Sequence, residues 1–475
     1  SDLGWFDFRR GERAFCRPRP EMPMQETESR PTGLQSSSAV PVLVCPRDQA
    51  SVEQRMSRRE ALLESRVVTD VQAIFYDVKA HGERAVLAAT KRHDRVELAA
   101  SRVAEAEVAR AVDELTPELR AALHLAGARI ELVNRGLIPQ DTLRELLPGV
   151  RVGECFCPLD SVGLWIPCRK GPLLSTALML VTAARVAGVP RIVALMPPRA
   201  DGSPDPGTLA AARLAGAHDC FVGNGIALLA AATHGTESLA RVAGVFGPGP
   251  GGIAVAMALA GMHGLKTVVG IGPTDCAVLA DDSADPRLVA WDLASEAEHG
   301  PDSAALLATP SADFARAVAA ELAVIIEGAE PTRRENLRQV FGDVGRGMLV
   351  VTPDFEAACA LAASFAPEHL SVVCRPERRD AALASAVAGE VLLGPHTPFS
   401  AANYAIGITA VLPTNGAARS ISGVTARDML RTTTVGELTE AALTALTPTI
   451  AALARYEGLP CHAAAAEARG APGRG

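Results

Sequence analysis

From about residue 150 onward, short apolar runs alternate with stretches rich in alanine and leucine. Residues 162–167 and 191–196 are runs of the first kind, and residues 175–187 between them have the spacing of a helix. Apolar runs without polar alternation are typical of parallel strands buried on both faces, and a helix usually connects two such strands. The alternation therefore predicts an α/β fold with a doubly wound parallel sheet.

A second such stretch begins near residue 251, which predicts a second α/β domain. We expect the two α/β domains at residues 151–265 and 266–414. Residues 41–150 have mostly helical spacing and should pack on the first domain, whereas residues 1–40 lack apolar periodicity and are typical of a flexible arm. The tail at 415–475 is expected to be mostly helical.

Composition and charge exclude several classes of function. A formal net charge of −8 gives no footprint for nucleic acid, and no basic block suggests a membrane surface. The longest apolar run, 173–189, is interrupted by Arg185 and small or polar residues, so we expect a buried helix and no membrane span. The ten cysteines include no CxxC motif, which is typical of reduced thiols in a cytoplasmic protein.

Two pairs of an acidic residue and a histidine carry the most chemistry in the sequence. Glu296 and His299 lie near the end of a predicted helix at a spacing that places both side chains on one face. A carboxylate and an imidazole held in this way can form half of a divalent metal site. Glu368 and His369 lie between a predicted helix and a strand, where adjacent groups of this kind can form a proton relay.

Other motifs are weak on their own. The glycine-rich stretch 247–252 does not match a dinucleotide-binding fingerprint, and its two prolines remove amide donors. His462 alone is typical of an exposed helix start, and Asn403 alone is typical of a turn.

Several segments, in the same order, make the chain resemble the histidinol dehydrogenase family from about residue 55 to 470. They are VGLWIP (162–167), PLLST (172–176), FGPG (246–249), AEHGP (297–301), APEHL (366–370), VLPT (411–414) and EGL (457–459) with His462. The resemblance implies a homodimer whose subunits contain two incomplete Rossmann-like domains and small helical extensions. It also implies that a C-terminal dimerisation segment reaches into the partner, and that zinc and NAD serve the oxidation of an amino alcohol to the amino acid.

The resemblance also implies roles for residues at matching positions. Glu368 and His369 match the family's acid–base pair, and Glu457 matches a carboxylate that contacts the substrate. Thr274 stands where the family has a serine that contacts the substrate.

The metal ligands differ from the family pattern of Gln, His, Asp and His. This chain has, in the same positions, Glu296, His299, Asn403 and His462. The two changes exchange an amide and a carboxylate between positions, so one carboxylate and two imidazoles remain. The preserved charge predicts that a divalent metal is still bound, and zinc suits this set of nitrogen and oxygen ligands.

The positions that match the family's NAD contacts differ more. Trp165 replaces a tyrosine, Ile226 a glutamine and Pro250 an asparagine. Isoleucine and proline cannot supply the lost side-chain hydrogen bonds, and each buried polar group left unpaired costs roughly 1–3 kcal/mol. These replacements weaken the case for NAD. Residues 409–410 (Thr-Ala) stand where the family has Asn-His, which removes an imidazole and predicts a substrate other than histidinol.

The sequence leaves two enzymatic functions open. The first is a metal-dependent dehydrogenase for a small polar alcohol, amino alcohol or aldehyde, with His369 as general base assisted by Glu368. The alternative keeps the metal and the acid–base pair without NAD, and catalyses a hydrolysis, hydration or elimination. Fold analogy favours the first, whereas the changed NAD positions favour the second. A catalytically inactive scaffold disagrees with the retained acid–base pair and the balanced ligand set.

Overall fold

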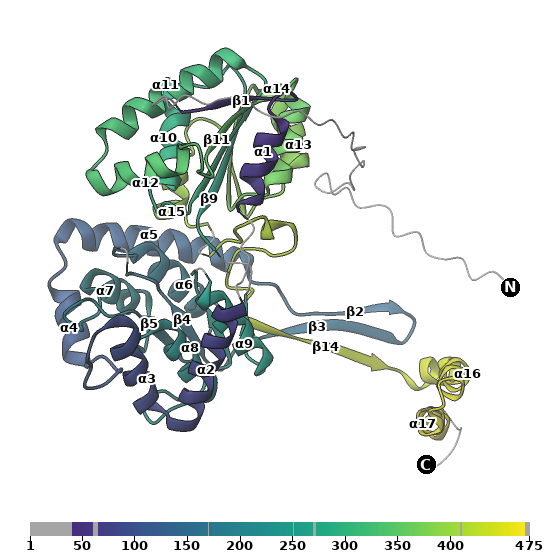
Figure 1. The fold of residues 1–475 in the computed structure, drawn as a ribbon. Coiled ribbons are helices and arrows are strands. Elements are labelled where there is room, and N and C mark those ends of the chain that lie inside the picture. Colours follow the sequence, from purple (N-terminus) through teal and green to yellow (C-terminus); the bar gives the residue numbers. More distant parts are fainter. Residues whose placement is uncertain are drawn as a thin grey trace.

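The computed structural model describes residues 40–59, 65–169, 171–249, 251–268, 272–408 and 411–470. Figure 1 shows two α/β domains and a stranded arm that ends in two helices. Three expectations from the sequence concern residues outside these ranges. They are the predicted flexible arm at 1–40, apart from residue 40, the candidate cofactor contact Pro250, and the Thr-Ala pair at 409–410.

The first α/β domain is built on a five-stranded parallel sheet with the order β6-β5-β4-β7-β8. This is the order of a doubly wound fold, in which the chain starts at a central strand and fills first one side and then the other. The strands are β4 (Val162–Trp165), β5 (Ile192–Met196), β6 (Asp219–Val222), β7 (Gly244–Phe246) and β8 (Lys266–Thr267). Every residue of β4 and β5 is buried, as expected of strands covered on both faces.

Helices cover both faces of this sheet (Figure 1). Those between the strands are α6 (Leu174–Val186), α7 (Pro206–Ala215), α8 (Gly225–His234) and α9 (Gly252–Met262). Those that precede the sheet in the chain are α2 (Ser65–His81), α3 (Glu83–Ala89), the π-helical turn η1 (Thr90–Asp94), α4 (Glu105–Asp113) and α5 (Pro117–Leu137). Residues from both groups share one hydrophobic core with the sheet.

The second α/β domain has a six-stranded parallel sheet with the order β1-β11-β10-β9-β12-β13. Its strands are β1 (Val42–Val44), β9 (Asp275–Ala280), β10 (Ala304–Thr309), β11 (Met348–Val351), β12 (His369–Val373) and β13 (Glu390–Leu393). Its helices are α1 (Gln49–Ser57), α10 (Pro286–Ala297), α11 (Ala312–Gly328), α12 (Pro331–Phe341), α13 (Phe355–Phe365), α14 (Pro376–Ser385) and α15 (Phe399–Tyr404). Separate hydrophobic clusters fill the two sides of the sheet.

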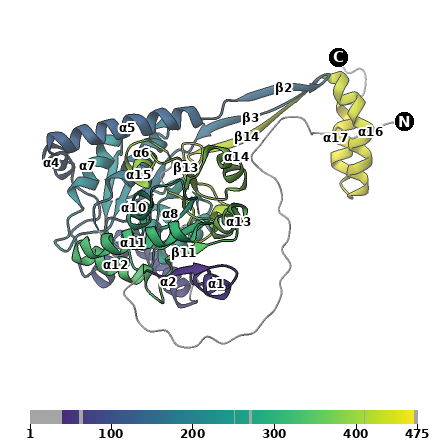
Figure 2. The same ribbon diagram turned by 90° about the horizontal axis from the view of Figure 1, so that it is seen from above.

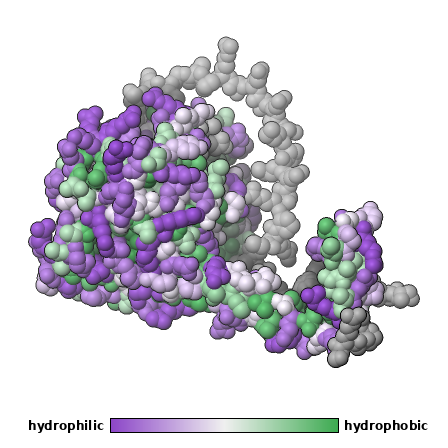
Figure 3. Space-filling model, turned by 90° about the horizontal axis from the view of Figure 1, so that it is seen from below, coloured by the Kyte–Doolittle hydropathy of each residue, from purple (hydrophilic) through white to green (hydrophobic). Residues whose placement is uncertain are grey.

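A three-stranded antiparallel sheet forms the arm that extends from the two domains (Figures 1 and 2). Its strands are β2 (Thr142–Leu147), β3 (Val150–Pro158) and β14 (Leu430–Leu438). The chain passes a short turn, η2 (Ala417–Arg419), before β14, and then forms α16 (Glu440–Tyr456) and α17 (Pro460–Gly470), which pack on each other at the tip. Figure 3 shows apolar surface along this arm and its helices.

The doubly wound α/β fold predicted from the sequence is confirmed, but three segments differ from the expected domain division. Residues 42–57 form β1 and α1, which join the second sheet, because a short apolar strand pairs with the open edge of β11. Residues 142–158 leave the first domain as β2 and β3. The tail expected to be helical contains β14, which pairs with β3. The two strands are far apart in the sequence, so local patterns do not predict their pairing.

None of the helices in the described parts of the chain is long and apolar enough to cross a membrane.

Candidate active site

The candidate site lies at the amino edge of the second sheet. In a parallel α/β unit each helix runs back antiparallel to the strands, so helix C-termini and strand N-termini share one edge. Glu296 therefore lies at the end of α10 on the edge where His369 begins β12 and Glu390 begins β13. Thr274 immediately precedes β9 on the same edge.

Local sequence signals fix where these elements start and stop. Helix α10 begins with Asp285, whose side chain accepts a hydrogen bond from the Arg287 amide, and with proline in its first turn. Helix α13 ends at Ala366, which adopts a left-handed conformation with φ 45°, and the following Pro367 prevents the helix from continuing. The start of α10 and the end of α13 thereby fix where Glu296 and Glu368 lie within their elements.

Three of the four predicted metal ligands meet there. The Asn403 amide donates a hydrogen bond from Nδ2 to Glu296 Oε1 at 2.9 Å. Glu296 is buried, and its Oε2 lies 3.7 Å from His299 Nε2 and 3.9 Å from His369 Nε2. Glu296 therefore links the metal-ligand candidates to the acid–base pair.

His369 is held from two sides. Its Nδ1 lies 2.6 Å from Glu390 Oε1, and its ring packs against Phe399 with 5.6 Å between ring centroids. The other ring nitrogen, Nε2, lies 3.6 Å from Glu368 Oε1. The imidazole thus presents Nε2 to Glu368 and Glu296.

Asp275, at the start of β9, positions the loop that carries Glu368. Its two carboxylate oxygens accept hydrogen bonds from the backbone amides of Glu368 at 2.7 Å and Asn415 at 2.6 Å. Arg59 Nη2 lies 2.8 Å from Asp275 Oδ2, an ion pair that is not aligned as a hydrogen bond. Arg59 also stacks on the Phe365 ring, with 3.4 Å from Cζ to the centroid, and donates to the Phe365 carbonyl.

The buried carboxylates shift one another's protonation. Burial, together with the charges of Asp275 and Glu296, raises the pKa of Glu368 to about 8 although His369 opposes this. Burial alone would lower the pKa of His369, but Glu296, Glu368 and Glu390 outweigh it and raise the pKa to about 10. Burial and the charge of Glu296 raise the pKa of Asp292, one turn earlier in α10, to about 7.

The remaining predicted site residues on the tail lie elsewhere in the same chain. Glu457 directly follows α16 and His462 is in α17, and both are exposed on the arm, whose helices lie away from the two domains (Figure 1). Within the described residues, no cluster of three or more His, Cys, Asp or Glu side chains is arranged to hold a metal. Glu296, His299 and Asn403 supply a carboxylate, an imidazole and an amide, a donor set that fits zinc once another ligand completes it.

Two of the candidate cofactor contacts, Trp165 and Ile226, lie at the carboxyl edge of the first sheet. Trp165 ends β4 and is 4% exposed, and its buried indole Nε1 has no hydrogen-bond partner among the residues that the structure describes. A Cβ at Gly225 would lie 2.6 Å from the Trp165 ring, so the tryptophan fills the space beside the start of α8. Ile226, in the first turn of α8, is half-buried and packs with the core. At these positions the chain offers apolar surface and a single unpartnered donor to a nicotinamide cofactor.

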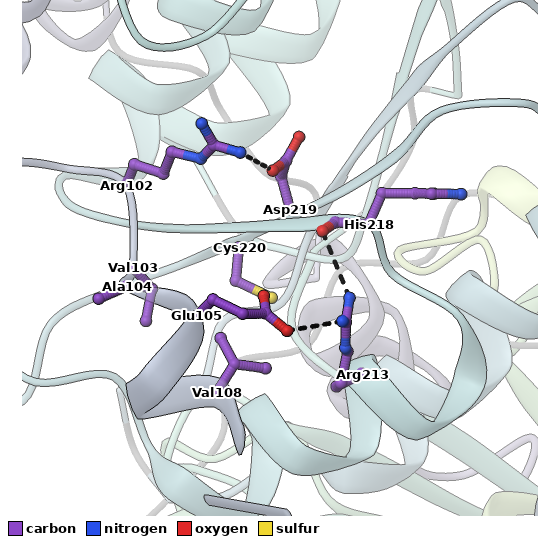
Figure 4. Close-up of a pocket in the computed structure, with 9 residues that line it drawn as sticks. All are labelled: Arg102, Val103, Ala104, Glu105, Val108, Arg213, His218, Asp219 and Cys220. Atoms are coloured by element: carbon purple, nitrogen blue, oxygen red, sulfur yellow. Dashed lines mark hydrogen bonds and ion pairs between the residues drawn. The ribbon is translucent and has the colours of Figure 1, made fainter. Parts of the chain in front are cut away.

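A separate cavity of about 200 Å³ lies in the first domain (Figure 4). Both arginines that line it are already paired with carboxylates. Arg213 Nη2 lies 2.6 Å from Glu105 Oε1, and Arg102 bonds Asp219. None of the site residues predicted from the sequence lines this cavity.

Comparisons with known proteins decide the family. A model of the histidinol dehydrogenase family matches residues 57–470. The histidinol dehydrogenase of Synechocystis sp. is 38% identical over 421 residues, which cover 87% of this chain and 95% of that protein. The chain belongs to the histidinol dehydrogenase family. It is therefore an enzyme of the oxidoreductase class, and the family resemblance found in the sequence is confirmed.

Further members of the histidinol dehydrogenase family agree with this assignment. The enzyme of Methanosarcina mazei is 34% identical over 424 residues, covering 89% of this chain and 95% of that protein. The crystal structure of histidinol dehydrogenase from Elizabethkingia anophelis matches with a TM-score of 0.85 and 28% identity, over 92% of this chain and 99% of that one. The two-domain fold and the protruding arm are thus part of a match that spans nearly the whole chain.

Three residues of the site were not found from the sequence: Arg59, Asp275 and Glu390. Asp275 and Glu390 are charged residues at the first position of otherwise apolar strands, which is the one local signal that marks them. Arg59 has no such signal, because its partner lies more than two hundred positions away in the sequence.

Proposed function

We propose that this chain is a metal-dependent dehydrogenase that oxidises a small polar alcohol, amino alcohol or aldehyde other than histidinol. The arrangement of Glu368 and His369 beside Glu296 carries the proposal. It places the Glu368 carboxyl group and the metal-ligand candidate Glu296 within 4 Å of the imidazole Nε2, which is the proton acceptor. The membership of the histidinol dehydrogenase family supports redox chemistry at this site.

Oxidation of an alcohol requires a base for the hydroxyl proton and an acceptor for the hydride. A metal cation at Glu296 would offset the largest of the charges that raise the pKa of His369, which would leave the imidazole neutral. Its Nε2 is then the nitrogen placed to take the proton, and Glu368 is within reach to exchange a proton with it. A zinc ion held by Glu296, His299, Asn403 and His462 would supply a positive charge that offsets the Glu296 carboxylate and polarises the substrate oxygen. NAD held beside Trp165 and Ile226 would supply the acceptor for the hydride.

The proposed substrate differs from histidinol because of residues 409–410. This chain has Thr-Ala where the family has Asn-His, so its sequence lacks the imidazole that the family has at this position. A site that lacks a polar partner for the substrate discriminates against the substrate that needs it. Histidinol remains the reference substrate, because the relatives are named for it.

We further propose a homodimer in which His462 and Glu457 of one copy complete the site of the other. The exposed position of both residues on the arm supports this, since neither reaches Glu296 within its own chain. We place the enzyme in the cytoplasm, because every cysteine in the described part of the chain is a free thiol.

A second candidate is an NAD-independent reaction, a hydrolysis, hydration or elimination that uses the same metal and acid–base pair. The buried Trp165 ring beside Gly225 favours it, because this side chain takes space at the edge where a dinucleotide would lie. Ile226 offers no hydrogen bond there.

Titration of NAD into zinc-loaded protein by calorimetry, followed by a screen of alcohols for NADH formation, tests the proposal. We expect saturable binding and faster turnover of a small polar alcohol or amino alcohol than of histidinol. Glu368→Gln and His369→Asn should each lower kcat by about 10²–10⁴-fold. Glu298→Gln, at an exposed position next to His299, is the matched control and should leave kcat unchanged.

Two outcomes would contradict the proposal. Zinc-loaded protein that does not bind NAD would point to the second candidate. Preferred turnover of histidinol would refute the change of substrate and keep the dehydrogenase.

A further inference from the structure

Glu390 is a buried carboxylate next to the catalytic imidazole, and neither the sequence motifs nor the family resemblance singled it out. It begins β13 directly beside His369, which begins β12, because the two strands are paired in register at these residues. Its Oε1 lies 2.6 Å from His369 Nδ1, and the two side chains are each 6% exposed. Within the described part of the chain, His369 is the side chain that bonds this carboxylate.

We propose that Glu390 is a positioning residue that holds the His369 ring with its proton on Nδ1, so that Nε2 is free to receive the substrate proton. This inference rests on the proposed function, in which His369 is the general base. A neutral imidazole carries one proton, and the hydrogen bond at one ring nitrogen decides which nitrogen accepts.

The backbone around Glu390 is bonded to the loop that carries the acid–base pair. The Glu390 amide donates to the Glu368 carbonyl at 2.9 Å, and the Gly389 amide donates to the Pro367 carbonyl at 2.9 Å. A Cβ at Gly389 would lie 2.7 Å from the Glu368 carbonyl oxygen, so a glycine permits this close approach. The backbone of Glu390 is therefore fixed to the loop that precedes the His369 ring, and its carboxylate orients that ring.

The remaining contacts of the ring favour this orientation. Phe399 packs against the imidazole and limits its rotation, with ring planes inclined at 54°. Nε2 faces Glu368 Oε1 and Glu296 Oε2 at 3.6 and 3.9 Å. A flipped ring would place its other edge toward these oxygens and lose the short contact with Glu390.

Glu390 also stabilises the product of proton transfer. When Nε2 takes the hydroxyl proton, the imidazole becomes a cation in a buried site, and the carboxylate at Nδ1 lies at hydrogen-bond distance from it. Residues that orient a metal-ligating histidine typically contribute about 10- to 100-fold to activity. We expect an effect of the same order for a carboxylate that orients a catalytic histidine. The contribution should reside in kcat, because Glu390 is separated from the substrate by the imidazole.

The test compares Glu390→Leu and Glu390→Gln with wild type in the full-length, zinc-loaded enzyme. Leucine removes the acceptor, whereas glutamine keeps an oxygen that can accept a hydrogen bond from Nδ1–H. Ser371→Ala, on the same strand as His369 and buried, is the control for a disturbed sheet. The readouts are kcat and KM for the substrate found in the screen, and the His369 tautomer from nitrogen-15 NMR of histidine-labelled protein.

We expect Glu390→Leu to lower kcat by about 10- to 100-fold with KM changed by less than about threefold. The NMR signals should show loss of the Nδ1-protonated form. Glu390→Gln should keep that form and recover most of kcat, and Ser371→Ala should match wild type. If leucine does not fold, the glutamine variant still tests the idea through its retained tautomer and kcat.

Equal kcat and an unchanged tautomer in Glu390→Leu would overturn the role of Glu390 while wild type remains active. If wild type oxidises no alcohol, the proposed function fails. The His369 tautomer then still tests the role of Glu390. A change of tautomer in Glu390→Leu, but not in Glu390→Gln or Ser371→Ala, supports that role, and an unchanged tautomer in Glu390→Leu overturns it.

Discussion

At the scale of single residues, the site is defined by carboxyl groups that are buried close together. Glu296, Glu368 and Glu390 surround His369, and their charges raise its pKa to about 10 against the effect of burial. Asp292 lies one turn before Glu296 and shares this environment. Such a concentration of acidic groups is unfavourable for stability and is typical of sites that bind a cation or move a proton.

The raised pKa of Asp292 predicts how the free energy of unfolding depends on pH. Its pKa is raised from 3.8 to about 7, so between these values the folded chain keeps a proton that the unfolded chain releases. The free energy of unfolding therefore falls as pH rises through this window. We expect Asp292→Asn to stabilise the chelator-treated protein by on the order of 2 kcal/mol at pH 8, and by less at pH 5.

Urea denaturation at both pH values measures this difference. Asp70→Asn, at a side chain 67% exposed, is the control and should change stability equally little at both. A gain for Asp292→Asn that is the same at pH 5 and pH 8 would argue against a raised pKa in the folded state.

At the scale of elements, the end of α1 and the starts of β9 and β12 are joined by one buried ion pair. Arg59 follows α1, and its partner Asp275 receives the amide of Glu368 before β12. The two side chains are 5% and 1% exposed, so solvent screens the pair little. An element from the beginning of the chain thereby fixes the loop of the acid–base pair.

Loss of the Arg59 charge should therefore destabilise the second domain. We expect Arg59→Met to cost about 3–5 kcal/mol, because it leaves the Asp275 carboxylate buried without its cation. Chemical denaturation monitored by circular dichroism provides the measurement. Arg66→Met removes an arginine that is 87% exposed and should cost less than about 0.5 kcal/mol. A cost for Arg59→Met as small as that of Arg66→Met would show that the pair contributes nothing.

At the scale of the whole molecule, the arm separates the last site residues from the two domains. Leucines and a tyrosine remain exposed on the arm strands and on α16, among them Leu146, Leu453 and Tyr456. Large exposed apolar side chains on a projecting element are typical of a surface that another chain covers. This agrees with the proposed dimer, in which the arm of one copy lies against the domains of the other.

Mixed dimers test whether two copies share a site. His369→Asn and His462→Ala should each be inactive alone. When the two variants are co-expressed, random pairing makes some dimers that keep one intact site, built from the wild-type domains of one copy and the wild-type tail of the other. We expect about a quarter of wild-type activity. Activity no higher than that of the separate variants would contradict shared sites, as would a monomer in light scattering.

The local patterns of the chain were sufficient to predict a large part of the fold. The buried strands from Val162 and Ile192, and the helices that follow them, appear where apolar runs and helical spacing place them. Strands β1 and β14 were not predicted, since residues 42–44 were expected in a helical segment on the first domain and residues 430–438 in a helical tail. Their pairing with β11 and β3 joins segments far apart in the chain. Hydrophobic periodicity reports which face is buried and does not report the partner.

The sequence by itself determined the residue types of the candidate site. The i and i+3 spacing of Glu296 and His299 and the adjacency of Glu368 and His369 follow from the order of residues in the chain. Only the tertiary structure decided which groups meet. It placed Glu390 at Nδ1 of His369, joined Arg59 to Asp275, and left His462 on the arm. The physical reason is that strand order and register bring together residues from distant parts of the chain, and a burial pattern contains no information about that order.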